Sequence, residues 1–236
     1  MTRPDHRAEN EHRQVKIITG VQKDPAGSVQ ISFGKTIVLV AASISDHVPG
    51  WLEGRGSGWI TAEYSMLPGA VPGRGRRGSG GRAKEIQRLI GRALRASVNL
   101  AALGERLITI DCDVIQADGG TRVASITGGW VALALATKTL LDEGLLDYDP
   151  LLEPVLAVSC VKLGDRIVLD PCYEEDHQAD VDANLVLTHS GKLVEFQATA
   201  EGSPFDDKDV MEMLSLARIG LSILAPIQSD AVKNKT

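Results

Sequence analysis

The middle of the chain changes its apolar period abruptly, and this change limits the possible folds more than any other feature. From Leu107 to Ile115 apolar residues alternate with polar ones, as in a strand with one buried face. After a short glycine turn, residues 123–143 have the apolar spacing of a helix, and Gly144 is a typical residue just past a helix C-terminus. A buried strand that leads directly into a long helix is typical of an α/β fold.

The rest of the chain continues this succession of strands and helices. Hairpin patterns surround Gly34-Lys35-Thr36, Gly164-Asp165 and Ser190-Gly191. Helical spacing runs from near Ala83 to Arg95 and from about Asp207 to Leu224. No linker rich in Pro, Ser or charge divides residues 1–236, and no internal repeat is present, so we predict a single two-layer α/β domain.

The composition is that of a globular protein with a sizeable core. The 236 residues are 43% hydrophobic and 24% charged, which excludes disorder over most of the chain. Cys112, Cys160 and Cys172 form no Cys-x-x-Cys pair, so we expect buried free thiols and a cytoplasmic location. The first seven residues lack the apolar stretch of a signal peptide, and no apolar run approaches the ~18 residues of a membrane helix, so we expect no membrane partner.

Positive charge is concentrated in one segment of an otherwise acidic chain. The net charge is −6, yet residues 74–95 contain a single acid, Glu85, among eight basic residues. The basic residues are Arg74, Arg76, Arg77, Arg82, Lys84, Arg88, Arg92 and Arg95. A solvated helix face beside a basic loop explains most runs of this kind, and a local nucleic-acid contact is the alternative.

Two glycine patterns resemble nucleotide-binding motifs but lack the context that those motifs require. Gly73–Gly78 fits G-x-G-x-x-G, but a dinucleotide fingerprint closes a strand and opens a helix, whereas prolines precede this one. Gly34-Lys35-Thr36 resembles the end of a P-loop, but Val29 occupies the place of the leading glycine. The histidines and serines fit neither zinc nor serine-hydrolase motifs. We therefore interpret the first pattern as a basic loop and the second as a hairpin turn.

The segment Asp118-Gly119-Gly120-Thr121-Arg122 has the features of an anion pocket. The two glycines let successive N–H groups point outward, the helix dipole adds positive charge, and the last two residues supply a hydroxyl and a guanidinium group. Arg82 follows two glycines at the start of the preceding helix, so two arginines at helix starts suit one phosphate. The alternative is an ordinary strand-to-helix turn with Thr121 as the N-cap.

An acidic segment, Tyr173–Asp182, is the candidate metal site. Asp176 and Asp182 are six residues apart, about 20 Å in an extended chain, so they reach one ion only if the segment bends. Carboxylate ligands favour Mg²⁺ or Mn²⁺. The alternative is a solvated acidic turn.

Four long motifs, taken together, resemble the ribonuclease PH family of bacterial phosphorolytic exoribonucleases, which trim tRNA 3′ ends. The motifs are Gly58–Pro68, Gly80–Arg95, Ile110–Arg122 and Gln197–Phe205. The similarity is collinear from about Gly27 to Ala225, although the arginine-bearing segment Gly69–Gly81 is shorter than usual for the family.

The resemblance implies a role for each candidate residue. It implies phosphate-binding residues at Arg82, Gly120, Thr121 and Arg122, and catalytic, metal-binding carboxylates at Asp176 and Asp182. It also implies a βαβ-rich two-layer domain that assembles as a hexameric ring of dimers.

We therefore expect a phosphate-dependent 3′-to-5′ exoribonuclease that releases nucleoside 5′-diphosphates from tRNA precursors with Mg²⁺ or Mn²⁺, and that also runs in reverse as a nucleotidyltransferase. Arg74, Arg76, Arg77 and Arg88 are expected to hold the RNA backbone. Two alternatives remain at this point: a ring subunit that binds RNA without catalysis, and a hydrolytic nuclease.

Overall fold

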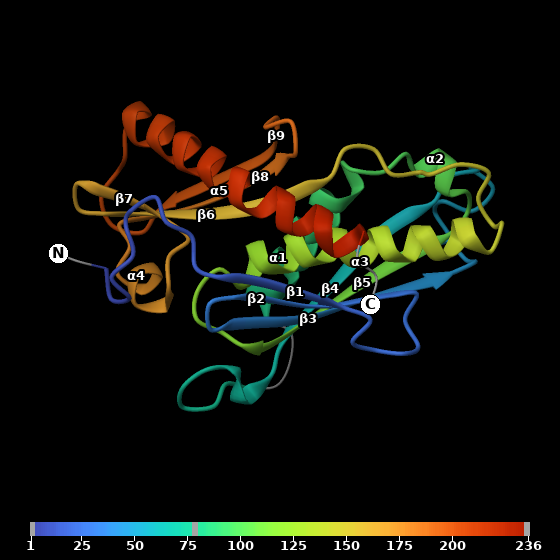
Figure 1. The fold of residues 1–236 in the computed structure, drawn as a ribbon, viewed down its shortest axis with the longest axis horizontal. Helices are drawn as coiled ribbons and strands as arrows, with labels where there is room; N and C mark the ends of the chain where they lie inside the picture. The colour runs from blue at the N-terminus through green and yellow to red at the C-terminus, as the bar shows by residue number, and fades with distance from the viewer. Residues whose placement is uncertain (1–2, 77–79, 234–236) are drawn as a thin grey trace.

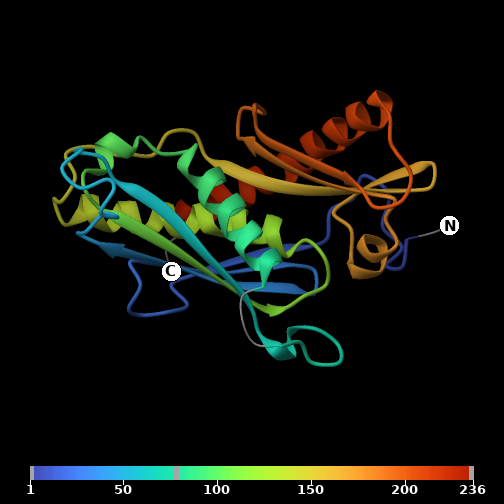
Figure 2. The ribbon, with the colours of Figure 1, turned by 180° about the vertical axis from the view of Figure 1, so that it is seen from behind.

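The computed structural model describes residues 3–76 and 80–233 and has the mixed α/β fold that the sequence predicts (Figures 1 and 2). One sheet contains β1 (Val15–Thr19), β2 (Gly27–Phe33), β3 (Thr36–Ser45), β4 (Trp59–Met66) and β5 (Leu107–Gln116). The other contains β6 (Val155–Leu163), β7 (Arg166–Leu169), β8 (Val181–Thr188) and β9 (Leu193–Ala200). The helices are η1 (Pro68–Ala70, a 3-10 turn), α1 (Gly81–Arg95), α2 (Leu100–Leu103), α3 (Thr121–Asp142), α4 (Tyr173–His177) and α5 (Asp207–Lys233).

The five-stranded sheet has the order β1-β2-β3-β5-β4. Its neighbouring strands are antiparallel except for β4 and β5, which are parallel and are connected through α1. The alternation along β5 places Ile108, Ile110, Cys112 and Val114 in the core, as predicted. The four-stranded sheet has the order β7-β6-β8-β9 and is antiparallel throughout.

Helix α3 lies between the two sheets and contacts strands of both (Figure 1). Its approach to β2 is so close that a Cβ atom on Gly27 would lie 2.1 Å from the carbonyl oxygen of Ala132. On its other side the Thr127 hydroxyl accepts a hydrogen bond from the backbone N–H of Ala157 in β6 (3.1 Å). The buried Gln228 of α5 donates to the carbonyl oxygen of Thr127 (2.9 Å), so α3, α5 and β6 are tied together at one point.

The sequence prediction differs from the structure mainly at the two ends of the chain. Strand β1 was not predicted, because Lys16 interrupts a short apolar segment that pairs with β2 only in the folded protein. The terminal helix does not end at Leu224 but continues through Pro226 to Lys233. A proline inside a helix removes one backbone hydrogen bond and usually ends or kinks the helix. Pro226 lies inside α5, so the tertiary packing of this helix overrides the usual effect of proline.

Two helices in the described part of the chain, α3 and α5, are long and apolar enough to cross a membrane by length and composition alone. Neither helix contains an uninterrupted apolar run of the length that a membrane span needs, which is why the sequence did not indicate a membrane span. In α3, 89% of the apolar window is buried inside the protein, as in the core helix of a globular fold, and in α5 the buried share is 28%.

The three cysteines are buried and free, as predicted. Burial raises the pKa of the Cys112 and Cys160 thiols well above their ordinary value, so both stay protonated and unreactive at neutral pH.

Candidate active site

The loop between β5 and α3 is built for close backbone approach. Gly119 and Gly120 both have left-handed backbones, with φ of 75° and 68°. A Cβ atom on Gly119 would lie 2.5 Å from the carbonyl oxygen of Pro171, so only glycine fits between this loop and the chain that leads into α4. Gly120, not Thr121, is the N-cap of α3, and no described side chain caps the helix. The first N–H groups of α3 are therefore available to an anion.

Thr121 is the first residue of α3, and a tyrosine holds its hydroxyl. The Tyr64 hydroxyl of β4 lies 2.8 Å from Thr121 Oγ1. Burial raises the pKa of Tyr64, so the phenol keeps its proton and is available as a donor to Thr121. The sequence reasoning assigned no role to Tyr64, although it lies in one of the four motifs.

A second hydroxyl, that of Thr36, holds the backbone of the glycine loop. Thr36 Oγ1 donates to the carbonyl oxygen of Gly119 (2.6 Å) and accepts from the backbone N–H of Asp118 (2.9 Å). Gly34-Lys35-Thr36 forms the hairpin turn that the sequence predicts. Its threonine also supports the glycine loop, 82 and 83 residues further along the chain, which no local pattern indicates.

The structure brings Arg82, Arg122, Asp176 and Asp182 together from four different elements. Arg82 lies in the first turn of α1, Arg122 is the second residue of α3, Asp176 lies in α4 and Asp182 in β8. Burial raises the pKa of Asp176, and Arg82 and Arg122 partly offset this rise. Both arginines therefore lie close enough to act electrostatically on the carboxylates.

The two aspartates share one environment. Burial raises the pKa of Asp182, and the negative charge of Asp176 raises it further. The side-chain amide of Asn184 donates to both oxygens of Asp182 (3.2 and 3.3 Å) and orients them. The acidic segment bends because residues 173–177 form the short helix α4, and this bend lets two carboxylates six residues apart converge.

The carboxylate pair suits a hard divalent cation that completes its shell with water and substrate. Within the described residues no group of three or more His, Cys, Asp or Glu side chains is placed to hold a metal ion. Mg²⁺ and Mn²⁺ need no such cage, because Mg²⁺ is usually held by one or two carboxylates together with water and substrate phosphates. The donor set of Asp176 and Asp182 fits that mode of binding.

The predicted RNA-binding arginines that the structure describes lie on the loop after η1 and on α1. Arg74 and Arg76 are exposed on the loop after η1, which extends away from the body of the protein (Figures 1 and 2). Arg77 lies outside the described residues. Arg88 is exposed on α1 and lines a groove of about 350 Å³ beside Trp59 and Gly91.

Comparison with known proteins gives one consistent result. A family model described as the 3′ exoribonuclease family, domain 1, matches residues 11–138, and the model for domain 2 of the same family matches residues 153–220. The chain is 53% identical over 235 residues to a protein of Caulobacter vibrioides named ribonuclease PH, covering 98% of this chain and 99% of that one. It is 51% identical over 236 residues to the ribonuclease PH of Maricaulis maris, with the same coverage.

Solved structures share the fold at much lower identity. Rice Rrp46 superposes with a TM-score of 0.83 at 20% identity, covering 98% of this chain and all of that one. A chain from the Archaeoglobus fulgidus exosome, solved with RNA bound to the active site, gives a TM-score of 0.82 at 22% identity and covers 97% of this chain.

Proposed function

Because this chain belongs to the 3′ exoribonuclease family, we propose that the site described above performs phosphorolysis of RNA from the 3′ end. The protein is a phosphate-dependent 3′-to-5′ exoribonuclease and nucleotidyltransferase. The observation that carries this function is the convergence of two arginines and a glycine-rich helix N-terminus on a pair of carboxylates. A hydrolytic nuclease needs carboxylates for its metal but has no use for a second anion pocket.

In the reaction, an oxygen of inorganic phosphate attacks the phosphorus of the last phosphodiester. The new P–O bond forms as the bond to the preceding 3′ oxygen breaks, and that oxygen takes up a proton to become the new 3′ hydroxyl. The released nucleotide is a nucleoside 5′-diphosphate, and the similar energies of the bonds broken and formed make the reaction reversible.

The chain's own groups deal with the repulsion between two anions. The free N–H groups at the start of α3 and the Thr121 hydroxyl hold the phosphate, while Arg82 and Arg122 neutralise its charge. Asp176 and Asp182 would hold a divalent cation, which supplies charge neutralisation at the transferred phosphorus. Asn184 keeps the Asp182 oxygens aimed at the same place.

Magnesium, with manganese as the substitute, is the cation we propose, since a two-carboxylate set suits a hard ion. We further propose tRNA precursors as the substrates, a hexameric ring of dimers as the assembly and the cytoplasm as the location. Three buried free thiols support the reducing compartment, and the family resemblance supports the substrate and the ring. Sedimentation of the purified protein tests the assembly, and a monomer would contradict it.

The products of the reaction test the proposed function. Purified protein is incubated with a 3′-extended tRNA, Mg²⁺ and increasing phosphate, and the released nucleotides are separated. We expect nucleoside 5′-diphosphates at a rate that saturates with phosphate. Monophosphates would indicate a hydrolase, and intact RNA that binds the protein would indicate a catalytically inactive binding subunit.

A further inference from the structure

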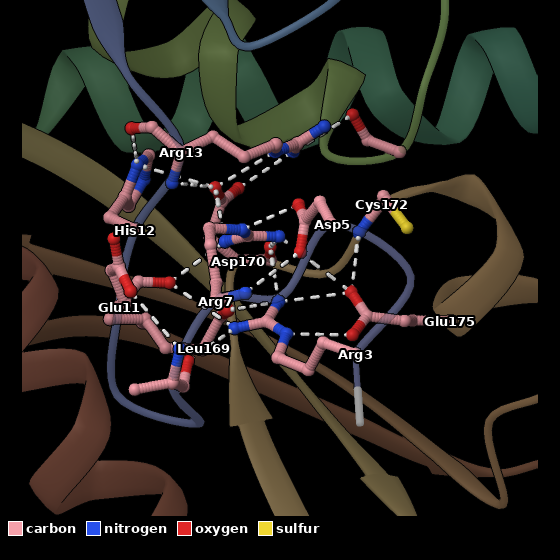
Figure 3. Close-up of polar contacts among 12 residues, drawn as sticks. Arg3, Asp5, Arg7, Glu11, His12, Arg13, Leu169, Asp170, Cys172 and Glu175 are labelled. Atoms are coloured by element: carbon pink, nitrogen blue, oxygen red, sulfur yellow. Dashed lines mark hydrogen bonds and ion pairs between the residues drawn. The ribbon is translucent and has the colours of Figure 1, made fainter. Parts of the chain in front are cut away.

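A short N-terminal segment, residues 3–13, contacts both the glycine loop and the chain that leads into α4. It runs from the start of the described chain to β1 and lies against the turn between β7 and α4 (Figure 3). Arg3 donates to both carboxylate oxygens of Glu175 in α4 (2.7 and 2.9 Å) and to the carbonyl oxygen of Leu169 (3.0 Å). Arg7 donates to the carbonyl oxygen of Asp170 (3.0 Å). We call residues 3–13 the N-terminal strap.

At the end of the strap Arg13 forms a buried, two-pronged ion pair with Asp170. Arg13 Nε and Nη2 lie 2.9 and 2.7 Å from the two carboxylate oxygens, and the backbone N–H of Arg13 donates to the same carboxylate (2.8 Å). The two side chains are only 5% and 1% exposed. Although burial raises the pKa of Asp170, the hydrogen bonds and charge of Arg13 hold it at about 2. Asp170 is therefore ionised at neutral pH.

The same guanidinium group reaches the glycine loop. It donates to the carbonyl oxygens of Asp118 and Gly119, the latter at 3.4 Å. A Cβ atom on Gly120 would lie 3.1 Å from Arg13 Nη2, so the arginine lies directly behind the N-cap of α3. One rigid planar group thus binds the loop on one side and Asp170 on the other (Figure 3).

Asp170 in turn fixes the start of the carboxylate segment. It has a left-handed backbone, with φ of 50°, and stands six residues before Asp176. The backbone N–H of Tyr173, the first residue of α4, donates to Asp118 Oδ1 (3.2 Å). Arg13 therefore joins the loop that offers N–H groups to phosphate to Asp170, which precedes α4, and the Tyr173–Asp118 hydrogen bond adds a direct contact between that loop and α4.

We propose that Arg13 is a positioning residue that sets the phosphate-binding loop relative to the carboxylate pair through its shared contacts with Asp170, Asp118 and Gly119. This inference rests on the proposed function. Neither the sequence nor any local pattern distinguishes Arg13 from the other arginines near the N-terminus. A buried ion pair is weak evidence for a gain in stability, so its geometric role is the better explanation for its presence.

The test replaces the planar guanidinium group of Arg13 but keeps its positive charge, because removal of the charge would leave Asp170 buried and unpaired. In Arg13→Lys the point charge can remain near Asp170, but one ammonium group cannot bind the carboxylate and both loop carbonyls in the same plane. We expect the KM for phosphate to rise about tenfold, as when a supporting contact of a bound group is lost, with kcat at saturating phosphate within about twofold of the parent. Phosphate binding measured by calorimetry should weaken by the same factor without any turnover.

Arg7→Lys is the matched control. Arg7 is partly buried, with its side chain 9% exposed, and lies 3.5 Å from the Asp170 carboxylate. No described contact joins it to residues 118–120, so its replacement should leave the KM for phosphate at the parent value. A purely structural role of the strap would instead lower the melting temperature and the active fraction in both variants without a selective change in phosphate affinity.

Each outcome decides the proposal. Equal phosphate KM in Arg13→Lys, Arg7→Lys and the parent would overturn it, as would an equal rise in both variants. If Arg13→Lys does not fold, the double variant Arg13→Gln with Asp170→Asn, which removes both buried charges at once, provides the second test, and unfolding of both would assign Arg13 to stability and overturn the positioning role. A parent protein that releases no diphosphate at any phosphate concentration would contradict the proposed function itself, which is a different result.

Discussion

Two groups of charged residues contact or adjoin the glycine loop, and they differ in how far their charges are paired within the protein. The strap group consists of Arg13 and its partner Asp170, which are almost fully buried and saturate each other with hydrogen bonds. The site group consists of Arg82, Arg122, Asp176 and Asp182. Within the described residues the side chains of Arg82 and Asp176 have no hydrogen bond or ion pair, Arg122 makes only a long ion pair with Glu85 (3.8 Å), and both Arg82 and Asp176 are more accessible than the strap group. Charges that are saturated inside the protein hold the backbone in place, whereas charges with few partners are available to bind a ligand.

The difference extends to the pKa values. Burial raises the pKa of Asp176 and Asp182, and their arginines only partly offset it, while the pKa of Asp170 is lowered although Asp170 is buried more deeply. The cost of burying the two carboxylates of the site group is therefore only partly compensated by Arg82 and Arg122, whereas Arg13 fully compensates the burial of Asp170. A bound divalent cation would supply the missing compensation.

The largest effect is expected for Asp182→Asn in the site group. Loss of one of two carboxylates should lower kcat about 1,000-fold or more, since groups that stabilise a developing charge contribute on this scale. Diphosphate release in saturating Mg²⁺ and phosphate is the measurement. Asp165→Asn, an exposed acid in the β6–β7 turn, is the control and should keep parent activity. Retained activity in Asp182→Asn would remove that residue from the mechanism.

Arg122→Ala should raise the phosphate requirement more than Arg13→Lys does, because it removes a direct charge from the pocket. We expect the KM for phosphate to rise about 30-fold, as expected for one charge-assisted hydrogen bond, while RNA binding changes little. Phosphate titrations of the rate and filter binding of RNA measure the two quantities. Arg55→Ala, on an exposed loop, serves as the control. Identical phosphate saturation in variant and parent would reject the pocket.

A third charged region, the loop that carries Arg74 and Arg76, should act on RNA alone. Neutralising Arg76 and Arg77 together should flatten the salt dependence of RNA binding, by about 1.4 in the slope of log K against log salt concentration for a single strand. The KM for phosphate should not change. RNA titrations at several salt concentrations provide the slope, and a slope equal to that of the parent would show that this loop does not contact RNA phosphates.

The smallest effect, and the sharpest contrast between the two groups, is expected in stability. A raised pKa means that folding favours protonated Asp182, so this residue contributes stability below its ordinary pKa and opposes folding as pH rises. Asp182→Asn should therefore raise the melting temperature by a few degrees at pH 7 without metal or phosphate.

The contribution of Asp170 to stability depends on pH in the opposite direction. Its pKa of about 2 in the folded protein lies below the ordinary 3.8, so its contribution is present above about pH 4 and is lost as pH falls toward 2. Asp170→Asn should lower the melting temperature at pH 7 by about 10 °C, and the difference from the parent should shrink in acid. Thermal melts of the parent and both variants between pH 7 and 3 measure this, and shifts of the same sign would contradict the distinction between the groups.

The sequence indicates the phosphate-binding loop better than the strap for a physical reason. Asp118–Arg122 is a local motif, and its glycines, hydroxyl and guanidinium follow one another along the chain, so their chemistry is visible without the fold. The main elements are visible for the same reason, since β5 and α3 bury their apolar faces with clear periods. Only the resemblance to a family connected Asp176 and Asp182 with that motif.

The strap depends instead on contacts between residues that are far apart in the chain. Arg13 and Asp170 are separated by 157 positions, and nothing near either one indicates that it is buried. The support that Thr36 and Tyr64 give to the loop is hidden in the same way, because a hairpin turn and an edge strand reach the loop only after folding. Local periodicity predicts elements, but it does not predict which polar side chains join them.

The most direct test of the central claim follows the phosphorus atom. Purified protein, Mg²⁺, a 3′-extended tRNA and radiolabelled inorganic phosphate are combined, and the released nucleotides are separated. Phosphorolysis predicts that the label appears as the β-phosphate of nucleoside 5′-diphosphates, with one labelled phosphate for each nucleotide removed. Shortened RNA with all of the label still in inorganic phosphate would contradict it.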